Sequence, residues 1–179
     1  MIVYILNAIT LSRILCAIFI YLYLYLESNY LVALLLFGFA SFSDFLDGYI
    51  ARKTNSESVL GEILDPIADK LLIVFVLIGL SINLDSFLIG FISAVIISRE
   101  IWVAALRDIN SRNNESDKTK VTFMAKTKTA TQMLAILMYL FGLTINNMMI
   151  LFFADIVLVV ALLITIQTGF QYTISTFKK

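Results

Sequence analysis

The chain alternates between long apolar runs and short polar breaks, and this pattern predicts six membrane-spanning helices. About 20 apolar residues in an α-helix cross the hydrocarbon core of a bilayer. The predicted spans are residues 8–27, 31–51, 66–83, 87–107, 124–144 and 147–170. Each span should be helical, because a backbone surrounded by lipid must satisfy its own hydrogen bonds. We therefore expect an all-α integral membrane protein in which residues 1–179 form one membrane domain.

Composition supports a membrane protein and removes several kinds of active site. Hydrophobic residues make up 60% of the 179 residues and charged residues only 15%, so the chain is more apolar than a soluble domain. Histidine is absent, which excludes a Ser-His-Asp triad and the commonest general base. The one cysteine, Cys16, cannot form an intramolecular disulfide. The first apolar run has no charged leader or small-residue cleavage site, so we expect it to belong to the mature protein.

Basic residues are strongly biased to one side of the predicted topology. With six spans, the termini and the loops after the second and fourth spans share a side, and nearly all 13 Lys and Arg residues lie on or near it. The opposite loops carry Glu27 and Asp85 but no Lys or Arg. Because loops rich in Lys and Arg stay in the cytoplasm, we expect a multi-pass protein of the cell (inner) membrane. Both termini should face the cytoplasm.

Four aspartates lie beside apolar runs, where an ionised carboxylate is costly and usually marks a functional site. They are Asp44, Asp47, Asp65 and Asp69. Helical spacing puts Asp44 and Asp47 on one face of the second span, and it puts Asp65 and Asp69 on one face of the next helix. The connection between the two helices is short enough for these faces to meet. The sequence therefore predicts a carboxylate cluster at the cytoplasmic edge of the membrane.

Clustered carboxylates repel one another unless positive charge lies between them. With no histidine or cysteine beside them, the ligands are oxygen atoms, which suit Mg²⁺ or Mn²⁺ together with substrate phosphates. Gly48 and Ala51 lie on the same face as the first aspartate pair and leave room for a large group, and Gly61 gives similar room before the second pair. Arg52 can make forked hydrogen bonds to a phosphate. The pattern favours a metal-dependent site for a phosphorylated substrate.

Three alternatives compete with this interpretation. Structural salt bridges from the aspartates to Arg52, Lys70 or Arg99 would leave an excess of acids and would not explain the small residues. A metal-ion transporter would need acidic residues spread through the membrane depth, whereas these gather near one edge. A non-enzymatic scaffold would have no activity to lose when metal ions are chelated.

The full spacing of the segment resembles the signature of the CDP-alcohol phosphatidyltransferase family. The family pattern is D-x2-D-G-x2-A-R-x8-9-G-x3-D-x3-D, and every fixed position is matched between Asp44 and Asp69. The chain length and the six predicted spans also fit, so the resemblance covers essentially all 179 residues. It implies the membrane fold of that family and a homodimer.

The resemblance also implies a reaction. The four aspartates would hold two divalent cations, Mg²⁺ or Mn²⁺, against the diphosphate of CDP-diacylglycerol. Asp69 would be the general base for an alcohol that attacks the β-phosphorus and expels CMP. Residues of the signature and of the N-terminal segment would contact the CDP-lipid: Asn7, Thr10, Asp47, Gly48, Ala51, Arg52, Ser58 and Gly61. For Asn7 and Thr10, a role in starting and capping a helix is an equal alternative.

Basic residues on the fourth and fifth spans indicate an anionic acceptor. Arg99 and Arg107 are eight residues apart and lie on one helix face. Lys126 and Lys128 open the fifth span near the same edge. Anchoring to the cytoplasmic side explains the lysines, but it explains poorly an arginine as deep in its span as Arg99. Both segments resemble those of family members that use sn-glycerol 3-phosphate, although Ala125 replaces their usual glycine. The resemblance implies that some of the four bases bind its phosphate.

The nearest rival is the same chemistry with another acceptor: phosphatidylglycerol (giving cardiolipin), an inositol phosphate or serine. The four basic residues disfavour neutral acceptors. The expected partners are the two substrates and membrane lipids. We expect no nucleic acid partner. Asp155 lies inside the sixth span, nearer the outer side. We expect it to bond to a polar residue of another span or to be protonated, and we give it no catalytic role.

Overall fold

The structure, a computed structural model, describes residues 2–26, 29–54, 59–120 and 122–178, with side chains except those of residues 2–6, 45–54, 59, 60 and 62. These residues form six α-helices and one short 3-10 helix, with no strand among them. The elements are α1 (Ile2–Leu26), α2 (Tyr30–Thr54), α3 (Val59–Asn83), α4 (Phe87–Arg112), η1 (Ser116–Thr119), α5 (Phe123–Thr144) and α6 (Met148–Phe177). The predicted all-α fold is confirmed, and each predicted span overlaps one α-helix.

α3 is longer than the span predicted for it. It begins at Val59, whereas the predicted span begins at residue 66. Hydropathy marks only the apolar part of a helix, and the polar stretch that contains Asp65 is helical as well. Pro66 lies inside α3, where its missing N–H leaves the carbonyl four residues earlier without a helical hydrogen bond. Asp65 and Asp69 consequently lie on one face of a single helix.

Polar turns join the helices where the sequence predicts breaks. Asp85 and Asn146 have positive φ angles of 47° and 52°, a left-handed conformation that Asp and Asn adopt more readily than most residues. Ser86 caps α4 by accepting a hydrogen bond from the N–H of Ile89 at 3.4 Å. Asn147 caps α6 in the same way. These caps satisfy N–H groups that the first turn of a helix leaves free.

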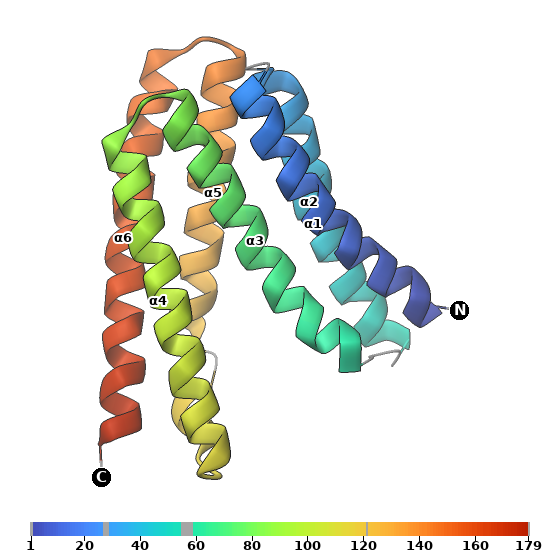
Figure 1. The fold of residues 1–179 in the computed structure, drawn as a ribbon, viewed down its shortest axis with the longest axis vertical. Coiled ribbons are helices and arrows are strands. Elements are labelled where there is room, and N and C mark those ends of the chain that lie inside the picture. The colour runs from blue at the N-terminus through green and yellow to red at the C-terminus, as the bar shows by residue number, and fades with distance from the viewer. Residues whose placement is uncertain (1, 27–28, 55–58, 121, 179) are drawn as a thin grey trace.

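The helices form two groups of three (Figure 1). α1 packs against α2 and α3, whereas α6 packs against α4 and α5. The groups are joined mainly where α3 meets α4 and where α2 meets α5. In Figure 1 the two groups diverge toward the end of the molecule that carries both termini. The two termini therefore share an end of the bundle, as expected for six helices that alternate in direction.

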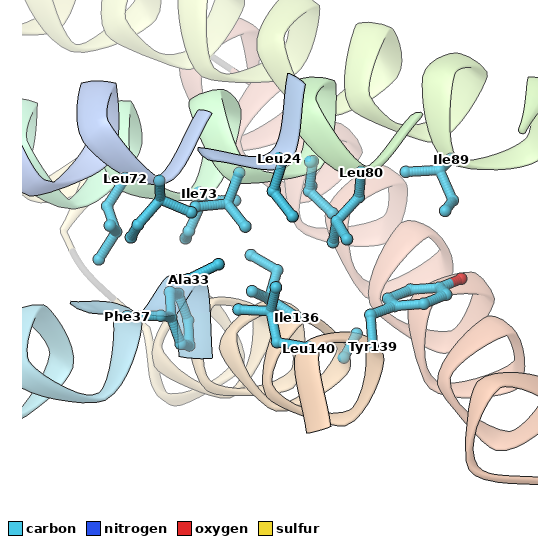
Figure 2. Close-up of a cluster of buried hydrophobic side chains, with 14 of the residues drawn as sticks. Leu24, Ala33, Phe37, Leu72, Ile73, Leu80, Ile89, Ile136, Tyr139 and Leu140 are labelled. Carbon is cyan, nitrogen blue, oxygen red and sulfur yellow. The ribbon is translucent and has the colours of Figure 1, made fainter. Parts of the chain in front are cut away.

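The core lies where the two groups meet at the other end. Leu24 of α1, Phe37 of α2 and Leu80 of α3 point toward Ile136 and Leu140 of α5 (Figure 2). All five side chains are nearly or completely buried. Burial of this apolar surface fixes the helices at the closed end and leaves the diverging end for polar groups.

Three helices, within the described residues, are long and apolar enough to cross a membrane: Asn7–Leu26, Phe87–Arg112 and Met148–Phe177. α2 adds a shorter apolar segment, Tyr30–Asp44. Large apolar side chains point outward along these helices; Phe152, for example, is 61% exposed. Such extensive exposed apolar surface belongs to a membrane protein. Crossing by all six helices stays a prediction.

Candidate active site

Two of the signature aspartates converge on one arginine of α1. Arg13 Nη1 lies 2.9 Å from Asp44 Oδ1 on α2 and 2.7 Å from Asp69 Oδ1 on α3. One turn earlier on α1, the hydroxyl of Thr10 donates a hydrogen bond to Asp65 Oδ1 at 2.8 Å. α1 therefore contacts carboxylates of both neighbouring helices. The arrangement brings together acids that are separated by up to 25 positions in the chain.

Arg13 is the residue of this cluster that the sequence analysis missed. Its side chain is 0% exposed, and a buried guanidinium needs acids beside it. The salt-bridge alternative thus holds in part, but through Arg13, whereas Lys70 and Arg99 pair with Glu100. The available signal was an arginine inside an apolar run, since a charge at that depth requires a partner.

The other residues predicted to contact the CDP-lipid are placed only in part. Four of them lie on the helical backbone of α2, but their side chains are outside the described residues: Asp47, Gly48, Ala51 and Arg52. Ser58 lies outside the described residues altogether. Asn7 on α1 and Gly61 on α3 are half-buried. Their predicted roles stay predictions.

The carboxylates present a donor set that fits a divalent cation. Asp44 and Asp69 approach the same positively charged nitrogen from different helices, so their oxygens already share one cationic centre. Among the described side chains, no three acids, cysteines or histidines gather around one point, and the Asp47 side chain lies outside that part of the chain. Oxygen ligands of this kind suit Mg²⁺ or Mn²⁺. The residues that would hold it are the four signature aspartates.

A cavity of about 170 Å³ opens beside Asp69. Residues of α3, α4 and α5 line it, and Pro66, Ile73 and Ile96 supply part of its apolar surface. Its charged lining consists of Asp69, Lys70, Arg99, Glu100, Arg107 and Lys128. The cavity thus joins one carboxylate of the signature to a wall of basic side chains.

Glu100 lies at the centre of that basic wall. Arg99 Nη1 is 2.9 Å from Glu100 Oε1, the ammonium group of Lys128 contacts the same oxygen, and Lys70 Nζ is 3.7 Å from Oε2. Arg99 and Lys128 are only 9% and 8% exposed, so one carboxylate compensates two buried cations. Of the four predicted acceptor residues, Lys126 is exposed and is not part of the cavity lining.

Arg99 has further contacts with α6. Its Nη2 donates a hydrogen bond to the hydroxyl of Thr168 at 2.9 Å, and its guanidinium carbon lies 5.6 Å from the centre of the Tyr172 ring. Arg107 approaches the same ring at 5.8 Å. The Nε of Arg99 is buried without a hydrogen-bond partner among the described residues. Arg99 also lines the cavity, so its cationic side chain suits an anionic ligand there.

The sequence analysis gave no role to Glu100, Thr168 or Tyr172. A glutamate next to a deep arginine was visible in the sequence, but its pairing with Lys128 depends on how α4 and α5 pack. The expectation for Asp155 is confirmed in its first form: the Tyr139 hydroxyl of α5 donates a hydrogen bond to Asp155 of α6.

Comparison with known proteins covers most of the chain. A family model described as CDP-alcohol phosphatidyltransferase matches residues 3–167. The chain is 37% identical over 150 residues to the CDP-diacylglycerol–glycerol-3-phosphate 3-phosphatidyltransferase of Haemophilus influenzae, covering 84% of this chain and 80% of that protein. A protein of the same name from Rickettsia bellii is 38% identical over 169 residues, covering 93% and 91%. The chain belongs to the CDP-alcohol phosphatidyltransferase family.

Proposed function

We propose that the protein transfers the phosphatidyl group of CDP-diacylglycerol to sn-glycerol 3-phosphate, giving phosphatidylglycerophosphate and CMP. The observation that carries this proposal is the cavity, which is lined by Asp69 and by the basic residues Arg99, Arg107 and Lys128. The names of the relatives in Haemophilus influenzae and Rickettsia bellii support the same activity. The protein would thus act in phospholipid biosynthesis.

The diphosphate of the donor is assigned to the aspartate cluster. Two divalent cations held there by Asp44, Asp47, Asp65 and Asp69 would neutralise the diphosphate and stabilise the departing phosphate. Gly48, Ala51 and Gly61 leave space for the nucleotide. Arg52, Asn7, Thr10 and Ser58 complete the proposed contacts with the CDP-lipid.

Asp69 is the proposed general base. It lines the cavity, and Arg13 holds its Oδ1 at 2.7 Å. The carboxylate takes the proton of the acceptor hydroxyl while that oxygen attacks the β-phosphorus. The bond between the β-phosphorus and the bridging oxygen of the diphosphate breaks, and CMP leaves with the bond electrons. A carboxylate fills this role because the chain has no histidine.

The phosphate of the acceptor is assigned to the basic wall. Guanidinium groups bind phosphate oxygens through paired hydrogen bonds, and Arg99 lines the cavity. Arg107 and Lys128 add positive charge from α4 and α5. Lys126 has the weakest part in this proposal, because it is exposed and lies outside the cavity lining. An acceptor without a phosphate group, such as serine, would offer these cations no phosphate oxygens to bind.

The bias of Lys and Arg supports a cytoplasmic position for the cavity and both termini in the cell inner membrane. We further propose a homodimer, which the family resemblance implies.

The direct test is CMP release from CDP-diacylglycerol by the purified protein in detergent micelles. We expect release with sn-glycerol 3-phosphate, and much less with phosphatidylglycerol, inositol phosphate or serine. EDTA should stop the reaction, and a comparison of added Mg²⁺ and Mn²⁺ should show which ion restores it better. Release with only another acceptor would overturn the acceptor assignment. No release with any of the four would overturn phosphatidyl transfer itself.

A further inference from the structure

We propose that Tyr172 is a positioning residue of the acceptor site, which fixes the spacing of Arg99 and Arg107 and links them to the start of α5. This inference rests on the proposed function, because it concerns the site assigned to the acceptor phosphate. No motif in the sequence singles out Tyr172, which lies beyond the end of the predicted sixth span at residue 170.

The ring of Tyr172 lies beside two guanidinium groups. Its centre is 5.6 Å from the guanidinium carbon of Arg99 and 5.8 Å from that of Arg107. Tyr172 is only 3% exposed, so both cation–π contacts are shielded from water and are stronger than contacts at a surface. The electron-rich face of the ring offsets part of the repulsion between the arginines. One ring therefore helps to hold two like charges near each other.

The adjoining turn of α6 is shaped to receive Arg99. The hydroxyl of Thr168 accepts a hydrogen bond from Arg99 Nη2 at 2.9 Å. At Gly169, an added Cβ atom would lie 3.2 Å from Arg99 Cγ, closer than an ordinary van der Waals contact. Thr168, Gly169 and Tyr172 are all buried. α6 thus forms a wall behind the arginine and limits the positions that its side chain can take.

The hydroxyl of Tyr172 connects this wall to α5. It donates a hydrogen bond to the carbonyl of Lys120 at 3.3 Å and accepts one from the N–H of Thr122 at 3.4 Å. Thr122 is the residue that caps α5, and its hydroxyl accepts a hydrogen bond from the N–H of Ala125 at 3.3 Å. α5 carries Lys128 into the cavity. Tyr172 therefore ties the two arginines of α4 to the helix that supplies the cavity lysine.

A site whose cations are already held in place binds an anion with less loss of side-chain freedom. Loss of the ring should therefore weaken binding of glycerol 3-phosphate more than it slows the chemical step at Asp69. Tyr172 lies outside the cavity lining, so its effect must pass through the arginines.

The test compares three variants in the CMP-release assay with wild-type protein. Tyr172→Leu removes the ring and should raise the KM for glycerol 3-phosphate by about tenfold. Its kcat and its KM for CDP-diacylglycerol should stay within about twofold of wild type. Tyr172→Phe keeps the ring and should raise the KM for the acceptor by less than about threefold. Phe170→Leu is the matched control, because Phe170 is 66% exposed on the same helix and should leave all three constants unchanged.

A double-variant cycle with Arg107→Ala separates positioning from general stability. If Tyr172 acts through Arg107, the KM of Tyr172→Leu combined with Arg107→Ala should rise less than the product of the two single effects. If Tyr172→Leu fails to fold, Tyr172→Phe and Thr168→Val are tested in its place. Each should raise the KM for glycerol 3-phosphate two- to threefold, which is about the effect of one lost hydrogen bond.

Two outcomes would overturn the inference. One is an unchanged KM for glycerol 3-phosphate in the folded Tyr172 and Thr168 variants. The other is a rise in KM for the double variant equal to the product of the rises for Tyr172→Leu and Arg107→Ala. These outcomes differ from failure of the proposed function, in which wild-type protein would release no CMP with glycerol 3-phosphate.

Discussion

The two halves of the cavity region carry opposite charges, but in each half one counter-ion contacts two like charges. On the α1–α3 side a single buried cation, Arg13, contacts the carboxylates of Asp44 and Asp69. On the α4–α6 side a single carboxylate, Glu100, contacts Arg99 and Lys128. In each half one counter-ion allows like charges to stay close together where water is scarce.

The halves differ in where that counter-ion lies. Arg13 is fully buried behind the aspartates and is not part of the cavity lining, whereas Glu100 lines the cavity itself. An anionic ligand in the cavity can therefore reach the cations that Glu100 holds. In the acidic half the counter-ion is Arg13, which a ligand in the cavity does not reach. Loss of Arg13 should thus act mainly on folding, and loss of the basic residues should act mainly on binding.

The largest expected effect is on chemistry in the acidic half. Asp69→Asn should lower kcat by about 10²–10⁴-fold, because the amide cannot take the proton of the acceptor hydroxyl. Binding of CDP-diacylglycerol should be retained in part. CMP release and equilibrium binding of the lipid measure the two properties. Asp155→Asn is the matched control, since Asp155 pairs with Tyr139 and does not line the cavity. Near-normal turnover of Asp69→Asn would remove Asp69 as the base.

The next effect is on stability. Arg13→Gln should lower the free energy of unfolding by roughly 3 kcal/mol, because it leaves two carboxylates without their buried partner. Added Mg²⁺ should restore part of the loss. The measurement is the melting temperature in detergent with and without Mg²⁺. Arg112→Gln is the control: it removes an exposed pair with Asp108 at 2.8 Å, which should contribute little. Equal melting temperatures for the two variants would contradict a special role for Arg13.

In the basic half, Arg99→Ala should raise the KM for glycerol 3-phosphate by about 10- to 100-fold, the usual worth of a hydrogen bond to a charged group. kcat should change less. Lys126→Ala should have a much smaller effect than either Arg99→Ala or Lys128→Ala, because Lys126 is exposed. Steady-state kinetics in both substrates distinguish these outcomes. An unchanged KM in Arg99→Ala would place the acceptor phosphate elsewhere.

The smallest effect concerns the other counter-ion. Glu100→Gln keeps a hydrogen-bond acceptor, and the cations that it leaves line a cavity that water or a ligand can enter. It should therefore lower the free energy of unfolding by only about 1 kcal/mol. Glycerol 3-phosphate should raise the melting temperature of this variant more than that of wild type, because its phosphate supplies the missing negative charge. Mg²⁺ should not substitute for it. If glycerol 3-phosphate raised the melting temperature of Glu100→Gln no more than that of wild type, a bound anion would not replace the charge of Glu100. The comparison with Arg13 and Mg²⁺ would then fail.

Local patterns in the sequence predicted the helices and the turns well. Apolar runs and polar breaks are properties of consecutive residues, and the breaks at Asp85 and Asn146 also carry the residue types that tolerate a left-handed backbone. The aspartate pairs could be placed on helix faces for the same reason.

Contacts between helices were harder to predict. Lys126 and Lys128 are two residues apart and point about 200° apart around the helix, so one is exposed and the other buried. Which of them enters the cavity depends on how α5 packs against α3 and α4. No pattern in the sequence singles out Tyr172, yet it is buried against two arginines.

On the proposed assignment, most residues for the two substrates lie in different halves of the chain, α1–α3 for the donor and α4–α6 for the acceptor phosphate. The aspartates assigned to the donor lie in the first three helices, and three basic residues assigned to the acceptor lie on α4 and α5. We therefore expect substitutions confined to the second half to change which alcohol is accepted without disturbing cleavage of the nucleotide. A chimera that exchanges α4–α6 between relatives with different acceptors should therefore exchange acceptor preference and keep the use of CDP-diacylglycerol.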